Sequence, residues 1–233
     1  MDTASYVARR GQIAHYFDRT AADAWAKLTS DAPVSKIRAT VRAGRDRMRG
    51  TLLSYLPEDL TGKRLLDAGC GTGALAVEAA RRGAHVTAID LSPTLIDLAR
   101  ERTPVDGLQG RIDFTAGDML DPALGEFDHV VAMDSLIHYT SPDMVRALAG
   151  LARRTRTSIV YTFAPKTPAL AAMHAVGRLF PRGDRAPAIE PVSRRRMHGA
   201  IDRHAELNDW RVGRGEKITS GFYMSHAQEL TRE

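Results

Sequence analysis

A chain of 233 residues with one cysteine, Cys70, suits one large α/β domain in a reducing, cytoplasmic compartment and excludes an internal disulfide bond. Its formal net charge of +5 favours acidic partners, which include nucleic acid, anionic lipid and small polycarboxylates, without choosing among them. The first residues lack the apolar core of a signal peptide and no stretch has the roughly 20 apolar residues that span a bilayer, so we expect a protein that is soluble or peripheral to a membrane.

The first part of the chain is predicted to be helical. Residues 1–30 place apolar side chains near helical spacing, and residues 34–56 form a second apolar stripe with arginines on the other faces. The aromatic residues of the first helix either pack on the core or cover a flat apolar ligand, with the Tyr16 hydroxyl at the rim. Most of the arginines suit a solvated face, although one of them could bind a carboxylate through two hydrogen bonds. We interpret residues 1–56 as a helical lid on an α/β domain over 57–233.

A glycine-rich turn follows the first predicted strand, residues 64–68. Glycine at 69 and 71 lets a ligand approach bare backbone, and the helix that follows directs its first N–H groups there. Asp67 at the strand end would repel a pyrophosphate and suits a cationic ligand such as S-adenosylmethionine. Gly69-x-Gly71-x-x-Ala74 also fits the looser nucleotide pattern, so an NAD or FAD site, or no ligand at all, stays open at this point.

The second predicted strand, residues 84–90, also ends in an acid. Asp90 is placed where a carboxylate holds the two hydroxyls of a ribose, and Leu91 would lie beside the adenosine. Ser92 and Pro93 begin the next helix as its cap and first turn, so the alternative role for Asp90 is a helix-capping acid.

A third acid follows the third predicted strand, residues 111–116. Asp118 could accept a hydrogen bond from an adenine amino group, with Met119 packed on the ring. Dinucleotide enzymes have no comparable need for an acid here, and ligands of open α/β sheets bind at the carboxyl ends of the strands. Three acidic strand ends in succession therefore favour a methyl-donor site over a dinucleotide site.

The loop after the fourth predicted strand, residues 127–133, would face the sulfonium and the methyl acceptor. Asp134-Ser135-Leu136-Ile137-His138-Tyr139 lacks the Asn/Asp-Pro-Pro-aromatic motif of enzymes that methylate exocyclic amines of bases. This departure counts against a nucleic-acid methyltransferase. A helix over 141–154 and a strand over 157–163 complete the alternating pattern.

The last part of the chain breaks that alternation. We expect an insertion over about 165–205 that covers the substrate, consisting of an apolar helix (168–180), a basic loop (181–187) and a basic helix (194–204). Strands over 210–218 and 222–230 form an antiparallel hairpin at the sheet edge. The predicted fold is α/β, a Rossmann-like, doubly wound, mostly parallel seven-stranded sheet with an antiparallel C-terminal hairpin strand and an N-terminal helical lid.

Segments from one end of the chain to the other resemble the class I S-adenosylmethionine-dependent methyltransferases and, more narrowly, the magnesium-protoporphyrin IX O-methyltransferases. They are His15–Thr20 with Trp25, Val34–Arg45, the glycine-rich turn, Val131–Tyr139, Ala164–Thr167, Leu179–Arg182 and Gly221–Tyr223. The resemblance implies methylation of one propionate of magnesium-protoporphyrin IX to the monomethyl ester in the bacteriochlorophyll pathway of a photosynthetic bacterium. It also implies peripheral association with the inner, photosynthetic membrane and hand-over of substrate from the magnesium chelatase large subunit.

Within this interpretation, His138 and Tyr16 hold the reacting propionate, and His138 could take its proton if the acid binds neutral. The alternative for His138 is a polar residue beside a helix. Arg38 or Arg42 would hold the donor carboxylate or the second propionate, and Tyr139 lies on the substrate side. The predicted S-adenosylmethionine site consists of Asp67, Gly69, Cys70, Gly71, Asp90, Leu91, Asp118, Met119, Met133 and Asp134.

We expect no metal bound by the protein, because the metal belongs to the substrate, and no nucleic-acid partner. Three rival functions stay open: a quinone-type O-methyltransferase, an NAD-dependent oxidoreductase, and a non-catalytic module that binds the donor or nucleic acid through the basic surface.

Overall fold

The structure is a computed structural model of the chain. It describes residues 4–20, 25, 28–29, 33–104, 106–167 and 188–233. The predicted apolar helix over 168–180 and the basic loop over 181–187 lie outside the described residues, as does part of the first predicted helix.

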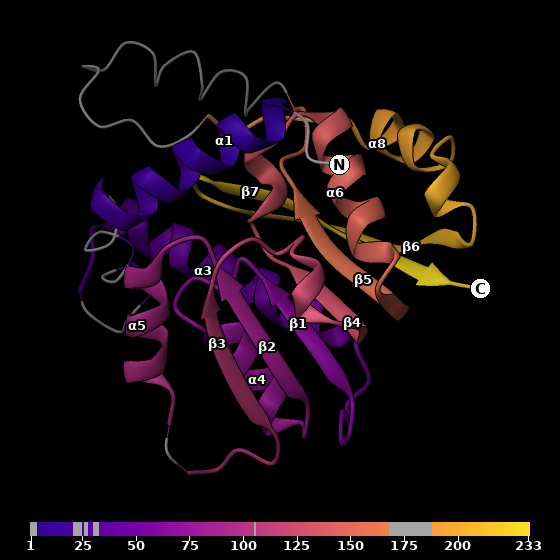
Figure 1. The fold of residues 1–233 in the computed structure, drawn as a ribbon. Coiled ribbons are helices and arrows are strands. Elements are labelled where there is room, and N and C mark those ends of the chain that lie inside the picture. The colour runs from indigo at the N-terminus through magenta and orange to yellow at the C-terminus, as the bar shows by residue number, and fades with distance from the viewer. Residues whose placement is uncertain (1–3, 21–24, 26–27, 30–32, 105, 168–187) are drawn as a thin grey trace.

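One seven-stranded sheet forms the centre of the molecule (Figure 1). Strands β1 to β5 are parallel, and β7 pairs antiparallel with both β5 and β6, which gives the order β3-β2-β1-β4-β5-β7-β6. The predicted fold class is confirmed. The strands are β1 (Arg64–Ala68), β2 (His85–Asp90), β3 (Arg111–Ala116), β4 (Phe127–Ala132), β5 (Thr155–Phe163), β6 (Trp210–Ser220) and β7 (Tyr223–Arg232).

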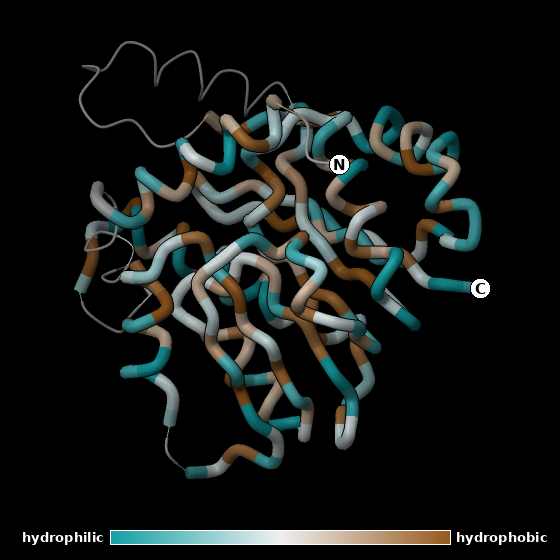
Figure 2. The backbone as a smooth tube through the Cα atoms, in the orientation of Figure 1, coloured by the Kyte–Doolittle hydropathy of each residue, from teal (hydrophilic) through white to brown (hydrophobic). Residues whose placement is uncertain are grey.

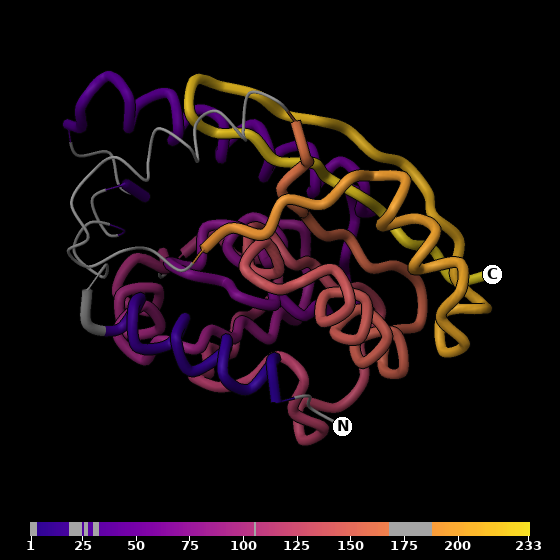
Figure 3. Tube along the Cα trace, turned by 90° about the horizontal axis from the view of Figure 1, so that it is seen from above, coloured from indigo at the N-terminus to yellow at the C-terminus, as the bar shows by residue number. Residues whose placement is uncertain are grey.

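Helices cover both faces of the sheet because each carries an apolar stripe that must be buried. One apolar cluster joins α1, α6 and α8 to the sheet, and a second joins α3 and α4 to its other face. Figure 3 shows α1 and α3 on opposite sides of the sheet, and Figure 2 shows hydrophobic segments along the central strands. The helices are α1 (Ala4–His15), α3 (Lys36–Ser54), α4 (Ala74–Arg81), α5 (Pro93–Arg102), α6 (Ser141–Ala152) and α8 (Arg194–Ile201), with 3-10 turns at Pro122–Leu124, Leu136–His138 and Ala205–Leu207.

The N-terminal helix does not continue as one α-helix. After α1 the chain widens into a π-helical turn, Tyr16–Thr20. Asp18 lies in this turn and its carboxylate accepts hydrogen bonds from the hydroxyls of Thr94 (2.7 Å) and Ser92 (3.3 Å). The turn is thereby attached to the N-terminus of α5, where a negative charge is favoured.

Helix α3 is fastened to the C-terminal hairpin of β6 and β7. Gly44 faces the ring of Tyr223 so closely that a Cβ built there would lie 2.6 Å from it. The Ser220 hydroxyl donates to the carbonyl of Thr40 (2.8 Å), and Arg214 donates to the carbonyl of Tyr55 (2.6 Å) beyond the end of the helix. These contacts hold one face of α3 against the hairpin and leave another face directed toward the strand ends.

Candidate active site

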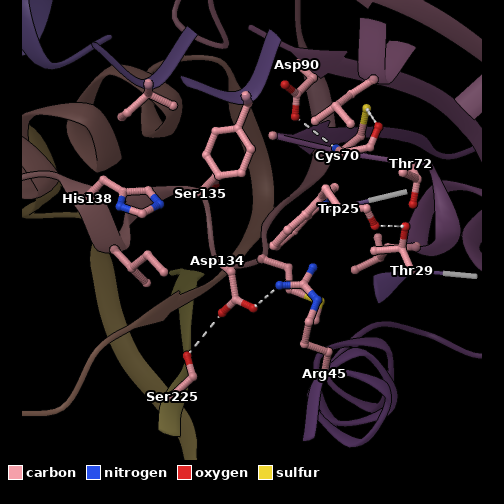
Figure 4. Close-up of a pocket in the computed structure, with 18 of the residues that line it drawn as sticks. Trp25, Thr29, Arg45, Cys70, Thr72, Asp90, Asp134, Ser135, His138 and Ser225 are labelled. Atoms are coloured by element: carbon pink, nitrogen blue, oxygen red, sulfur yellow. Dashed lines mark hydrogen bonds and ion pairs between the residues drawn. The ribbon is translucent and has the colours of Figure 1, made fainter. Parts of the chain in front are cut away.

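A cavity of about 900 Å³ lies at the carboxyl ends of the parallel strands. The ends of β1, β2 and β4 and the loop after β3 form one wall, and residues of α1, the π-helical turn and α3 form the other. Every residue that the sequence predicted for the site lines this cavity, including His138 and Tyr16. Figure 4 shows the part of the cavity around Trp25 and Asp134.

The glycine turn between β1 and α4 needs residues without side chains. Gly69, Gly71 and Gly73 have φ of 85°, 55° and 79°, a left-handed region that other residues rarely adopt. A Cβ at Gly69 would also lie 2.3 Å from the Cβ of Ser135. The turn therefore presents bare backbone to the cavity, as the sequence predicted.

Asp67 is the next-to-last residue of β1, just before this turn, and is 1% exposed. Its Oδ2 atom has no hydrogen-bond partner among the described residues. Burial, followed by the nearby charge of Asp90, raises the pKa of the Asp67 carboxyl to about 7. An orphaned, buried carboxylate oxygen suits a ligand that brings a positively charged donor, so this part of the site fits the amino group of S-adenosylmethionine.

Asp90, at the end of β2, bridges the glycine turn and the start of α5. One carboxylate oxygen accepts from the backbone N–H of Gly71 (2.9 Å) and the other from that of Ser92 (3.0 Å). The first bond fixes the glycine turn. The second is to Ser92, the N-cap residue of α5, whose own hydroxyl caps the helix by accepting from the backbone N–H of Leu95 (3.2 Å). Burial raises the pKa of Asp90 despite these bonds. A contact with ribose hydroxyls stays a prediction.

Asp118 has partners that the sequence did not predict. Its carboxylate accepts a hydrogen bond from the Tyr6 hydroxyl (2.9 Å) and pairs with Arg10, both on α1. It also accepts from the backbone N–H of Leu120 (2.9 Å). The predicted contact with an adenine amino group would share a carboxylate that already attaches α1 to the sheet.

Asp134 follows β4 with a left-handed backbone, φ 54°, which an aspartate tolerates better than most residues. Its carboxylate pairs with Arg45 of α3 (2.6 Å) and accepts from the hydroxyls of Tyr223 (3.0 Å), Ser225 (3.2 Å) and Thr162 (3.1 Å). These four partners join the loop after β4 to α3, to β5 and to the hairpin. The carboxylate of Asp134 therefore holds together segments that surround the cavity. Its predicted contact with the cofactor stays a prediction.

The two residues predicted to hold the acceptor both lie close to Phe17. The ring of Tyr16 is 5.2 Å from that of Phe17, and the His138 ring is 6.1 Å from it. His138 is buried, and its Nδ1 lies 3.4 Å from the carbonyl oxygen of Ala188. The fold therefore brings a residue of the lid and a residue of the loop after β4 into one cavity.

Tyr139 was predicted to contact the substrate, and it is more deeply buried than that role would suggest. It is 2% exposed and its ring stacks on that of Tyr6 at 4.9 Å. Burial raises the pKa of its hydroxyl. Its predicted contact with the substrate stays a prediction, while its packing against α1 is a feature of the structure.

The arginines of α3 that face the cavity follow helical spacing. They are Arg38, Arg42, Arg45 and Arg49. Arg38 is exposed at the mouth, and the Nε of Arg42 donates to the carbonyl of Leu28 (3.0 Å). Successive members are four, three and four residues apart, a spacing that places all four on one face of a helix. This spacing was visible in the sequence, but only Arg38 and Arg42 were predicted for the site. The cavity thus has carboxylates at the strand ends and guanidinium groups on α3.

Among the residues that the structure describes, no three His, Cys, Asp or Glu side chains gather in a group that could hold a metal ion.

Comparison with known proteins identifies the family. A family model described as magnesium-protoporphyrin IX methyltransferase C-terminus matches residues 132–232, and one described as methyltransferase domain matches residues 65–158. A magnesium-protoporphyrin O-methyltransferase of Rhodobacter capsulatus is 51% identical over 225 residues, which are 96% of this chain and 97% of that protein. The chain belongs to the magnesium-protoporphyrin O-methyltransferase family. The predicted family and its methyltransferase activity are thereby confirmed.

A solved structure of a family member agrees over nearly the whole chain. The crystal structure of magnesium protoporphyrin IX methyltransferase from Synechocystis with bound SAH (S-adenosylhomocysteine) has a TM-score of 0.84 and 25% identity, covering 96% of this chain and 100% of that one. A ubiquinone biosynthesis O-methyltransferase of Xanthomonas euvesicatoria is 39% identical over 134 residues, which are 54% of this chain and 55% of that protein. The likeness to this quinone-type relative thus extends over about half of the chain.

Proposed function

We propose that this chain transfers the methyl group of S-adenosylmethionine to one propionate carboxylate of magnesium-protoporphyrin IX and forms the monomethyl ester, in bacteriochlorophyll biosynthesis. The observation that carries the proposal is the 51% identity to a magnesium-protoporphyrin O-methyltransferase across nearly the full length of both chains. The cavity supports it, because one wall suits a cationic donor and the other an anionic acceptor.

The donor end is formed by the strand ends. The Oδ2 atom of Asp67 would accept from the donor's amino group, and the bare backbone at Gly69 and Gly71 would let the adenosyl group approach. Asp90 is placed to accept from ribose hydroxyls in addition to its two backbone bonds. When bound, S-adenosylmethionine supplies an electrophilic methyl group on a sulfonium.

At the acceptor end the residues position a group that is already charged. A propionate has a pKa near that of glutamate, about 4.3, so it is ionised at neutral pH and needs no strong base. His138 and Tyr16 would hold the carboxylate, remove its water and align one oxygen with the methyl group. Alignment of this kind can supply on the order of 7–11 kcal/mol.

Arg38 and Arg42 would bind a second carboxylate at the mouth of the cavity. A guanidinium binds a carboxylate through two parallel hydrogen bonds, which favours a dicarboxylate such as magnesium-protoporphyrin IX over a neutral quinone. The same residues could instead bind the carboxylate of the donor.

The direct test is incubation of the purified protein with S-adenosylmethionine and magnesium-protoporphyrin IX, followed by mass spectrometry of the porphyrin. We expect a gain of one CH₂ unit. Substituting His138→Ala or Tyr16→Phe should lower turnover about 100-fold or more, since positioning is lost, and leave the affinity for S-adenosylhomocysteine within about twofold. His85→Ala, at an exposed position of β2, is the matched control.

Two results would contradict the proposal. An unchanged porphyrin mass, with methylation of a quinone precursor by the same preparation, would assign the chain to the quinone-type enzymes. Near-normal turnover in both His138→Ala and Tyr16→Phe would remove these residues from the acceptor site.

We further propose a cytoplasmic protein that associates peripherally with the inner, photosynthetic membrane and receives substrate from the magnesium chelatase large subunit. The net charge of +5 and the exposed row Arg194, Arg195 and Arg196 on α8 support contact with an acidic surface. No helix in the described part of the chain is both long enough and apolar enough to cross a membrane. Sedimentation with anionic vesicles at low salt, and release at high salt, would support the membrane contact; a protein that stays in solution at low salt would refute it.

A further inference from the structure

The indole of Trp25 lies directly against the glycine turn. Its Nε1 atom is 3.3 Å from the position that a Cβ would occupy at Gly71. Trp25 lines the cavity together with the strand-end acids, and Figure 4 shows it between the turn at Cys70 and the pair of Asp134 and Arg45. A ligand that approaches the bare backbone at Gly71 must therefore either pack against this indole or displace it.

Arg45 of α3 lies over the face of the indole. The guanidinium carbon lies 4.5 Å from the centre of the Trp25 ring, a cation–π contact. The ring of Phe17 meets Trp25 edge to face at 5.5 Å. Thr29 donates through its hydroxyl to the carbonyl of Trp25 (2.7 Å), and Arg102 of α5 donates to that hydroxyl (3.0 Å). The side chain and the backbone of Trp25 are both held in place.

The guanidinium itself is fixed by a buried carboxylate. Arg45 is 19% exposed and pairs at 2.6 Å with Asp134, which is 7% exposed. Because Asp134 also accepts hydrogen bonds from Tyr223, Ser225 and Thr162, it holds the guanidinium of Arg45 in a fixed position. A continuous set of contacts thus joins the C-terminal hairpin, α3, Trp25 and the glycine turn.

We propose that Trp25 packs against the bound methyl donor at the glycine turn, and that Arg45 is a positioning residue that holds the indole there. This inference rests on the proposed function, since it assumes that the donor binds at the turn. Tryptophan offers a large apolar face to an adenosyl group and is the most favourable aromatic partner for a cation such as a sulfonium. Arg45 acts through Trp25 and does not touch the donor.

The chain suits a fluorescence test because it contains two tryptophans. Trp210 is buried on β6 with Arg232 against its ring, so Trp210→Phe leaves Trp25 as the sole tryptophan, which can be excited at wavelengths where tyrosine does not absorb. In that variant we expect S-adenosylhomocysteine to change the intensity or wavelength of the emission, with the same saturation curve as calorimetric binding. Binding by calorimetry without an emission change would overturn the inference.

The affinity of Trp25 variants for S-adenosylhomocysteine shows whether the indole packs on the donor or blocks its site. If the indole packs on the donor, Trp25→Ala should weaken the binding of S-adenosylhomocysteine about tenfold and Trp25→Phe by less, since some aromatic contact is kept. If the donor has to displace the indole, Trp25→Ala should bind as tightly as the parent or more tightly, and the inference fails.

The role of Arg45 is tested against a matched arginine. Arg45→Met should shift the emission of Trp25 in the free protein toward longer wavelength and weaken the affinity for S-adenosylhomocysteine. Arg45→Lys keeps the charge opposite Asp134 but loses the flat stacking surface, so it should restore the affinity only in part. Arg47→Met removes the same charge from an exposed position of α3 and should change neither quantity. Equal effects of Arg45→Met and Arg47→Met would overturn the positioning role.

A failure of this inference can be distinguished from a failure of the proposed function. Binding of S-adenosylhomocysteine with methyl transfer but no involvement of Trp25 rejects only this inference. No binding of the donor product by any method rejects the proposed function as well.

Discussion

Three acids near the strand ends differ in the way their charge is compensated. Asp118 and Asp134 have arginine partners, whereas Asp67 is buried beside Asp90 with one oxygen unpartnered. An isolated buried carboxylate is costly in its charged form, which is why its pKa rises. Asp67 is therefore the acid whose protonation should respond most to a cationic ligand.

Donor binding should depend on pH through Asp67. Its pKa of about 7 means that part of the free protein carries a protonated Asp67 at neutral pH, and an ammonium group on the ligand favours the carboxylate. The affinity for S-adenosylhomocysteine should therefore rise with pH up to about 7 and level off above it. Calorimetry in two buffers of different ionisation enthalpy should detect proton release near pH 6 that fades near pH 8.

Asp67→Asn serves as the control for this effect. It should bind more weakly and lose the pH dependence in this range, because an amide cannot titrate. The titratable neighbours that face Asp67 are Asp90 and Cys70, and burial raises the pKa of both. An unchanged pH dependence in Asp67→Asn would assign the proton to Asp90.

At the scale of elements, α3 connects the cavity to the C-terminal hairpin. One face carries the arginine row that lines the cavity, and another packs on β6 and β7 around Gly44 and Tyr223. Tyr223 also donates to Asp134, the carboxylate that holds Arg45. A shift of α3 would therefore disturb both the arginine row and this carboxylate. The position of this helix therefore determines the shape of the cavity wall.

Two glycines of α3 allow this packing to be measured. Gly44→Ala places a Cβ 2.6 Å from the Tyr223 ring and should destabilise the protein by about 1–3 kcal/mol. At Gly50 a Cβ would meet nothing within 4 Å, so Gly50→Ala should stabilise it by roughly 0.5–1 kcal/mol through helix propensity alone. Urea unfolding measures both values, and a stabilising Gly44→Ala would show that α3 does not pack as described.

At the scale of the whole molecule, the cavity is lined by segments from both ends of the chain, and these segments carry opposite charges. Asp67 and Asp90 at the strand ends suit the positive charge of the proposed donor, and Arg38 and Arg42 of α3 suit the carboxylates of the proposed acceptor. A dinucleotide would place its pyrophosphate beside Asp67 and Asp90, where burial already penalises negative charge.

Ligand binding should therefore stabilise the fold selectively. S-adenosylhomocysteine at about 100 times its dissociation constant should add about 2.7 kcal/mol of stability. For a chain of this size that corresponds to a rise of about 5–10 °C in the unfolding temperature. NAD at the same concentration should give no shift, and an equal shift with NAD would contradict the assignment of the donor site. Differential scanning fluorimetry measures both.

Much of the cavity wall at the strand ends was predictable because its residues are local in the sequence. Glycines at 69, 71 and 73 define a turn that only glycine adopts easily, and the apolar runs before Asp67 and Asp90 define buried parallel strands. Parallel strands end at the same edge of a sheet, so acids at successive strand ends had to lie close together. These local patterns were thus enough to establish the fold class, the family and the residues of the strand-end wall.

The partners of these residues, in contrast, follow from how distant parts of the chain pack together. The pairs Asp134–Arg45 and Asp118–Tyr6 join positions 89 and 112 residues apart, and no local pattern specifies them. The same holds for the choice of Arg45 among the arginines of α3 and for the position of Trp25 against Gly71. Such contacts depend on how α1 and α3 dock on opposite faces of the sheet, which packing of the whole apolar core determines.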